Sequence, residues 1–265
     1  MQDLSEFWSG EDYDQQYAHL YEDDIALIEQ LIEEKQAKSL LDICCGTGIV
    51  TIPLAEKLEH VVGVDLSPDM LKRAKQKVGP TLSVRFLERN AVTFSLQSRF
   101  DVVIMTGNAF QAFANDEDFA RLLSNIAAHL NPEGVFIFDT RLPTSGNLEL
   151  DDDFKPCPSY LDAKGEQVQC FRRAARYDKE NKVLYSLSRR IYADGSVKET
   201  SIDLKYRSIE TIEQCLAEAG FIVDKRYADW RRSEWLENSN SLICVAKKVN
   251  RPQEEVNTYV YASNL

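Results

Sequence analysis

The 265-residue sequence has no apolar run close to the roughly 20 residues that a membrane-spanning helix needs. Its N-terminus is acidic, whereas a secretion signal begins with basic residues. We therefore expect a cytoplasmic protein that has no membrane partner. With 44% apolar residues, the chain is long enough to bury one large core and a smaller embedded module.

The sequence also has fewer basic than acidic residues, and its cysteines follow no recognisable motif. The formal net charge of -12 gives a surface that repels phosphate backbones, so nucleic-acid binding would need a concealed basic groove, and a small molecule is favoured as the partner. The six cysteines fit neither a zinc pattern nor a disulfide framework, which predicts free thiols. The run Asp151–Asp153 is interpreted as a solvated acidic turn, and no metal site is predicted. The sequence leaves a homodimer open.

Five segments rich in strand formers alternate with helical segments along the first half of the chain. They are residues 39–43, 61–65, 83–87, 100–105 and 134–139. The last two are nearly all apolar, as expected for strands that are covered on both faces. This alternation predicts an α/β fold in which helices cover both sides of a parallel sheet.

The pattern changes after Arg141. Residues 166–207 hold three strand-like segments separated by turn residues, and Asp194-Gly195 is a good hairpin signal. An amphipathic helix is expected near the N-terminus, over residues 15–35. We therefore divide the chain into an N-terminal helical lid (1–36), a main α/β domain (37–140 and 208–248), an antiparallel β insertion (141–207) and a C-terminal tail (249–265).

A glycine-containing turn, Asp42-Ile43-Cys44-Cys45-Gly46-Thr47-Gly48, follows the first expected strand. Its glycines let the backbone pass close to a ligand at the helix N-terminus, where free amide donors gather. Asp65 ends the second expected strand, where a carboxylate can accept hydrogen bonds from ribose hydroxyls. A glycine pair alone also fits a tight turn, but the two signals together predict a nucleotide site. A nicotinamide site would place a third glycine where this chain has Thr51.

These motifs, with the apolar segment 100–105, resemble those of class I S-adenosylmethionine-dependent methyltransferases. The resemblance covers about residues 10–248 and implies a Rossmann-like, doubly wound seven-stranded sheet whose last strand is antiparallel. It also implies a cofactor, S-adenosylmethionine, with S-adenosylhomocysteine as its product. The residues implied to bind it are Asp42, Cys44, Gly46, Gly48, Asp65, Leu66, Met70, Asn90, Ala91 and Thr106. A helix-capping role is the alternative for Asn90.

The segments after the fourth and fifth strands, and the insertion that follows, resemble those of glycine N-methyltransferase and its small-amine relatives. The resemblance implies that Asn108 and Arg141 grip a substrate carboxylate, which a guanidinium can engage with two parallel hydrogen bonds. Tyr160 and Tyr206 roughly match the substrate-side tyrosines of that family. An ion pair with a nearby aspartate is the alternative for Arg141, and ordinary packing is the alternative for the tyrosines.

One departure from that family concerns the N-terminal segment. The family binds the cofactor carboxylate with an arginine there, and His19–Asp24 contains none. We expect Tyr13, Tyr17 or Tyr21, which are spaced four residues apart, to close over the cofactor instead.

The predicted activity is methyl transfer to a small polar acceptor, either an amine or a hydroxyl compound. The sequence leaves open whether this acceptor also carries a carboxylate. His60 and His129 are expected at helix ends away from the strand tips, which leaves no obvious histidine base. This favours an amine acceptor, because an amine needs only to be neutral whereas a hydroxyl profits from a general base. The alternative is a cofactor-binding regulatory or partner subunit without activity of its own.

Overall fold

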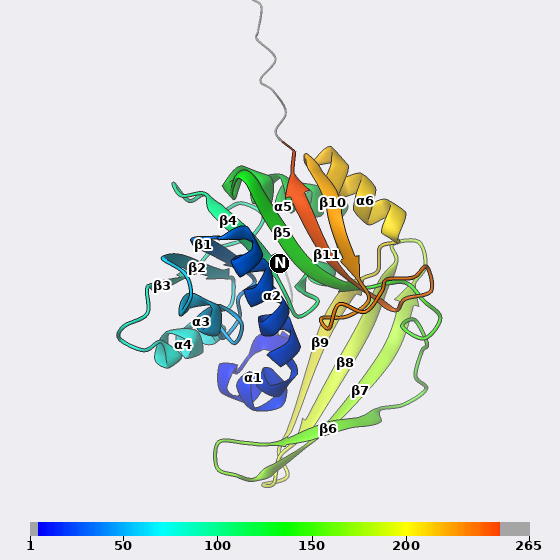
Figure 1. Ribbon diagram of the computed structural model, residues 1–265. Coiled ribbons are helices and arrows are strands. Elements are labelled where there is room, and N and C mark those ends of the chain that lie inside the picture. Colours follow the sequence, from blue (N-terminus) through cyan, green and yellow to red (C-terminus); the bar gives the residue numbers. More distant parts are fainter. Residues whose placement is uncertain (1–4, 250–265) are drawn as a thin grey trace, which may run out of the picture.

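The chain forms two β-sheets in a computed structural model that describes residues 5–249 (Figure 1). The larger sheet contains β1 (Ser39–Ile43), β2 (His60–Asp65), β3 (Val84–Glu88), β4 (Phe100–Met105), β5 (Leu130–Arg141), β10 (Phe221–Tyr227) and β11 (Ser241–Lys248). The smaller sheet contains β6 (Lys155–Leu161), β7 (Gln167–Asp178), β8 (Val183–Ile191) and β9 (Val197–Lys205). The helices are α1 (Gly10–Tyr17), α2 (Glu22–Lys35), α3 (Thr51–Ala55), α4 (Pro68–Lys77), α5 (Asp116–His129) and α6 (Ile209–Glu218).

The larger sheet has seven strands in the order β10-β11-β5-β4-β1-β2-β3. Strands β1 to β5 pair in parallel, whereas β11 runs antiparallel between β5 and β10. Apolar side chains of α2 and α3 cover one face of the sheet, and those of α5 and α6 cover the other. The central strands are buried on both sides for this reason. The predicted doubly wound sheet with an antiparallel last strand is therefore confirmed.

The smaller sheet follows β5 and is antiparallel throughout, in the order β6-β7-β8-β9. The sequence analysis expected three strands over residues 166–207 and missed β6. In β6, Pro156 pairs with Phe171 at the edge of the sheet. Proline is tolerated at an edge because no further strand needs its missing N–H.

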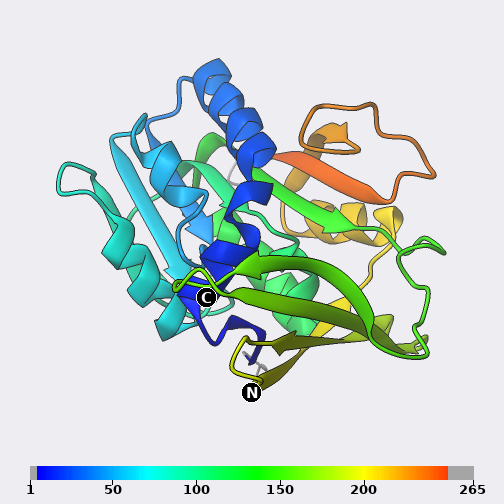
Figure 2. The ribbon, with the colours of Figure 1, turned by 90° about the horizontal axis from the view of Figure 1, so that it is seen from below.

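The N-terminal segment, defined as residues 5–21, contacts the smaller sheet and α4, a helix packed on the larger sheet (Figure 2). The 3-10 turn Ser5–Phe7 touches β9, and α1 touches β6 and α4. The single helix expected over residues 15–35 is wrong, because a 3-10 turn at Ala18–Leu20 separates α1 from α2. This break brings the hydroxyls of Tyr13 and Tyr21 to 2.9 Å, although residues eight apart in one straight helix would be offset by about 12 Å.

The structure bears on two further expectations. No helix within residues 5–249 is long and apolar enough to cross a bilayer. Apart from Val249, whose N–H donates to the Gly220 carbonyl, the predicted C-terminal tail lies outside the described residues.

Candidate functional site

A cavity of about 910 Å³ opens at the carboxyl ends of the parallel strands, where ligands of open α/β sheets usually bind. The smaller sheet and the N-terminal segment provide its other walls. Its volume lies near the top of the usual range for small-molecule sites. The residues predicted for the site that line it are Tyr13, Tyr17, Tyr21, Asp42, Cys44, Gly46, Asp65, Leu66, Met70, Asn90, Ala91, Thr106, Asn108, Arg141 and Tyr206. Gly48 and Tyr160 do not line it.

The turn after β1 needs left-handed backbone at three positions. Cys44, Gly46 and Gly48 have φ angles of 60°, 54° and 73°. A Cβ on Gly46 would meet no atom within 4 Å, so this residue leaves open space. A Cβ on Gly48 would approach the Phe86 ring to 2.8 Å, so Gly48 serves the packing of the turn against β3.

Two aspartates stand at the tips of β1 and β2. The Asp65 carboxylate accepts hydrogen bonds from the backbone N–H groups of Gly46 and Ser67, each at 2.8 Å. Asp42 accepts a hydrogen bond from Thr51 Oγ1 at 2.5 Å, and burial raises the pKa of Asp42 to about 7. Thr51, which entered the interpretation of the sequence only as a missing glycine, therefore fixes the Asp42 side chain.

Asn90 caps a turn just after β3. Its Oδ1 accepts the Val92 N–H at 2.9 Å, and its carbonyl accepts the N–H of Phe94 at 2.9 Å. The side chain thus holds the turn that presents Ala91 to the cavity, and Asn90 is exposed. No helix lies between β3 and β4, so the helix-capping alternative is not found.

The tips of β4 and β5 meet at the other end of the cavity. Asn108 has a left-handed backbone with φ 58°, and its N–H donates to Asp139 Oδ1 at 2.9 Å. Burial raises the pKa of Asp139 to about 6, although the Asn108 N–H and the charge of Arg141 act in the opposite direction. Arg141 faces the cavity, and its guanidinium forms no ion pair within residues 5–249. The ion-pair alternative for Arg141 is therefore not found in the described chain.

The five predicted tyrosines occupy different surroundings. Tyr206 is buried, follows β9 and lines the cavity. Tyr13, Tyr17 and Tyr21 line it from the N-terminal segment, and the Tyr13 and Tyr17 rings pack at a tilt of 54° with centroids 4.8 Å apart. Gly107 leaves room for Tyr21, because a Cβ there would lie 2.5 Å from the Tyr21 hydroxyl.

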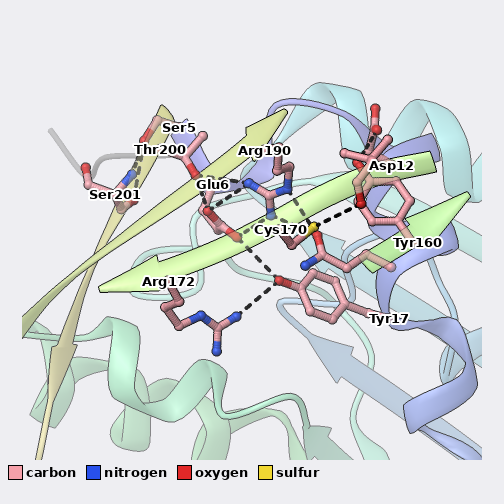
Figure 3. A network of polar contacts seen from close by, with 12 residues as sticks. Ser5, Glu6, Asp12, Tyr17, Tyr160, Cys170, Arg172, Arg190, Thr200 and Ser201 are labelled. Atoms are coloured by element: carbon pink, nitrogen blue, oxygen red, sulfur yellow. Dashed lines mark hydrogen bonds and ion pairs between the residues drawn. The ribbon is translucent and has the colours of Figure 1, made fainter. Parts of the chain in front are cut away.

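Tyr160 instead anchors the N-terminal segment (Figure 3). Its hydroxyl donates to the Asp12 carboxylate, to which Tyr192 also donates at 3.3 Å. The pKa of Tyr160 is raised by burial and by the Asp12 charge. In this position the side chain joins α1 to β6 and does not reach the cavity.

Sequence reasoning missed Asp24, a cavity-lining carboxyl in the first turn of α2. Its side chain is only 5% exposed, and burial together with the charge of Asp139 raises its pKa to about 8. Acidic residues are common in the first turn of a helix, so the position gave no signal. The fold buries Asp24 but leaves its neighbour Asp23 half-exposed and paired with Arg231.

Comparisons with known proteins agree with this geometry. The chain matches the model of a methyltransferase domain over residues 40–134. It is 28% identical to the glycine/sarcosine N-methyltransferase of Aphanothece halophytica over 82% of this chain and 78% of that protein. Its fold is similar to an S-adenosylmethionine-dependent methyltransferase from Clostridium acetobutylicum, with a TM-score of 0.75, 18% identity, and coverage of 88% of this chain and 98% of that one. It is also similar to an amino pentose methyltransferase from Micromonospora echinaspora solved with S-adenosylmethionine, with a TM-score of 0.65, 23% identity, and coverage of 86% and 92%.

Proposed function

Because the chain belongs to the class I S-adenosylmethionine-dependent methyltransferases, we propose that it methylates the nitrogen of a small amine that carries a carboxylate. The observation that supports the acceptor part of the proposal is the Arg141 guanidinium, which forms no ion pair within residues 5–249 and lines the same cavity as the predicted cofactor residues. The names of the relatives support nitrogen as the acceptor atom, since one acts on glycine and sarcosine and another on an amino pentose.

The tips of β1 and β2 suit S-adenosylmethionine, which when bound supplies a methyl group activated by a sulfonium. Gly46 has no side chain, so it leaves space for a ligand to lie against the backbone, and Asp65 lines the cavity beside it. In the proposed site, Asp65 accepts the ribose hydroxyls with the lone pairs that its two amide donors leave free. Leu66 and Met70 flank the adenine.

The tips of β4 and β5 suit the acceptor. Arg141 binds its carboxylate with two parallel hydrogen bonds, which fixes the direction in which the attached amine points. Asn108 adds a polar contact from the neighbouring strand tip. Holding the nitrogen in line with the activated methyl group supplies much of the rate enhancement, because the reaction asks for little further chemistry from the protein.

Calorimetry and a turnover screen test the proposal together. S-adenosylmethionine should bind, and release of S-adenosylhomocysteine should follow with glycine, sarcosine or small amino sugars as acceptors. Turnover with hydroxyl compounds alone would make oxygen the acceptor atom. Binding without turnover in a broad screen would favour the regulatory or partner-subunit alternative, and absence of cofactor binding would overturn the whole assignment.

A further inference from the structure

Two carboxyl groups in the cavity wall form no ion pair within residues 5–249, although the charge of Arg141 acts on one of them, Asp139. Asp24 and Asp139 are 5% and 6% exposed, and both line the cavity. Apart from its own N–H, the Asp24 carboxylate accepts no hydrogen bond from the described chain, and Asp139 accepts only those of its own N–H and of Asn108. The other deeply placed cavity acids have more complete partners: Asp42 with Thr51, Asp65 with two backbone amides, and Glu6 with Arg190.

Burial without a cation is unfavourable for a carboxylate. Desolvation penalises the charged form and raises the pKa of Asp139 to about 6. Desolvation together with the charge of Asp139 raises the pKa of Asp24 to about 8. The titratable and charged groups that face the pair are Tyr21, Asp23 and Arg141. A cationic ligand would replace the proton that the pair otherwise holds.

The surroundings suit a positively charged nitrogen. Trp230 and Tyr21 line the same cavity, and aromatic faces stabilise cations by roughly 0.5–2 kcal/mol. Asp139 and Arg141 lie two residues apart on one face of β5, so their Cα atoms are separated by about 6.7 Å. This spacing presents one acidic and one basic group to a molecule that carries both an ammonium and a carboxylate.

Sheet geometry favours the acceptor over the cofactor as the source of that nitrogen. Strands β1 and β4 lie between β2, which carries Asp65, and β5, which carries Asp139. Three strand spacings put the two aspartates about 14 Å apart across the sheet. With the ribose at Asp65, Asp139 stands at the far end of the cavity, on the side of Arg141.

We propose that Asp24 and Asp139 bind the protonated amino group of the acceptor, and that Asp139 takes up the proton this group loses before methyl transfer. The inference rests on the proposed function and names its substrate class as a primary or secondary ammonium. An N–H bond of the ammonium breaks, the proton moves to a carboxylate oxygen of Asp139, and the electron pair stays on nitrogen. That pair then forms the new N–C bond while the C–S bond breaks with its electrons going to sulfur.

The test compares acceptors that differ only in the reacting atom. With S-adenosylhomocysteine bound, calorimetry measures glycine against glycolate, and sarcosine against methoxyacetate. The wild-type protein should prefer each amine by at least tenfold. Asp24→Asn and Asp139→Asn should each remove most of that preference and leave the oxygen compounds within about twofold. Asp23→Asn, the half-exposed neighbour paired with Arg231, should shift the preference by no more than about twofold, because Asp23 is the smallest of the causes that raise the pKa of Asp24.

The cofactor has an amino group of its own, so a second arm compares S-adenosylhomocysteine with methylthioadenosine, which lacks the amino acid part. If Asp24→Asn weakens only the former, the pair serves the cofactor and the acceptor assignment is overturned. An unchanged preference for amines in both Asn variants, or no preference in the wild type, also overturns it. Turnover tests the proposed function separately. If the wild-type enzyme methylates an amine while both Asn variants keep the amine preference, the proposed function holds and only the role of the two aspartates is wrong.

Discussion

The two ends of the cavity are built in different ways. At the proposed nucleotide end, the polar groups come from neighbouring turns, and the Asp65 carboxylate accepts from the backbone N–H groups of Gly46 and Ser67. At the acceptor end, the wall combines α2, β5 and β9 with the N-terminal segment, which is held by partners far away in the chain. The first end therefore depends on local backbone geometry and the second on tertiary docking. Such a division allows acceptor contacts to change while the cofactor cradle stays intact.

The buried pair between Glu6 and Arg190 is the clearest sign of that docking (Figure 3). Arg190 Nη2 lies 2.7 Å from Glu6 Oε1 and 3.0 Å from Gln16 Oε1, and Arg190 is only 3% exposed. Thr200 also donates to Glu6, so the carboxylate is bound from both β8 and β9.

Arg190→Ala should produce the largest effect, because it leaves the buried carboxylate of Glu6 without its cation. We expect a loss of about 3–5 kcal/mol in the free energy of unfolding, measured with urea. Hydrogen exchange should rise most in residues 5–21. Arg189→Ala is the matched control, since this neighbour forms an exposed ion pair with Glu199 worth no more than about 1 kcal/mol. Equal losses for the two variants would show that the N-terminal segment is not held by this pair.

The same contrast explains what the sequence could predict. The apolar runs of β4 and β5 and the glycine turn after β1 depend on local sequence. The large sheet and the left-handed turn at the tip of β1 could therefore be predicted, whereas the cofactor contacts proposed there stay predictions. The edge strand with Pro156 and the break between α1 and α2 were not, because distant elements decide them. Burial of Asp24, and the withdrawal of Tyr160 toward Asp12, likewise depend on contacts between segments far apart in the chain.

Asp65→Ala should test the nucleotide end by itself. It removes the acceptor of two backbone amides and of the proposed ribose contacts, so cofactor affinity should fall by more than about tenfold in calorimetry. Asp69→Ala, an exposed position in the first turn of α4, should leave affinity within about twofold. Normal affinity in the Asp65 variant would show that the ribose is bound elsewhere.

Arg141→Ala should affect the acceptor end alone. We expect the acceptor KM to rise by about tenfold, since a charge-assisted hydrogen bond contributes about 1.5–3 kcal/mol, while cofactor affinity stays near normal. Arg141→Lys should recover part of the loss, because a lysine keeps the charge but not the paired donors. Unchanged acceptor kinetics in both variants would show that Arg141 binds no carboxylate of the acceptor.

Asp24→Asn should stabilise the ligand-free protein in a pH-dependent way. The pKa of Asp24 is about 8 in the folded chain against an ordinary 3.8, so between these values the folded state binds more protons than the unfolded state. Stability of the wild type therefore falls as the pH rises through this window. The Tm advantage of the variant should be absent below pH ~4 and reach at least ~2 °C near pH 8. A constant difference across this range would contradict an uncompensated charge at Asp24.

Tyr21→Phe should give the smallest effect, because it keeps the aromatic face in the cavity and removes only the hydroxyl. The substitution removes one hydrogen bond, that with Tyr13, and keeps the ring against Gly107. A loss of about 0.5–1.5 kcal/mol corresponds to two- to tenfold, and we expect the lower part of that range in cofactor affinity and acceptor KM together. Tyr160→Phe, outside the cavity, should change neither constant by more than about twofold if Tyr160 only anchors α1. If Tyr21→Phe shifts one constant and not the other, the tyrosine belongs to that end alone, and the N-terminal segment closes over a single ligand.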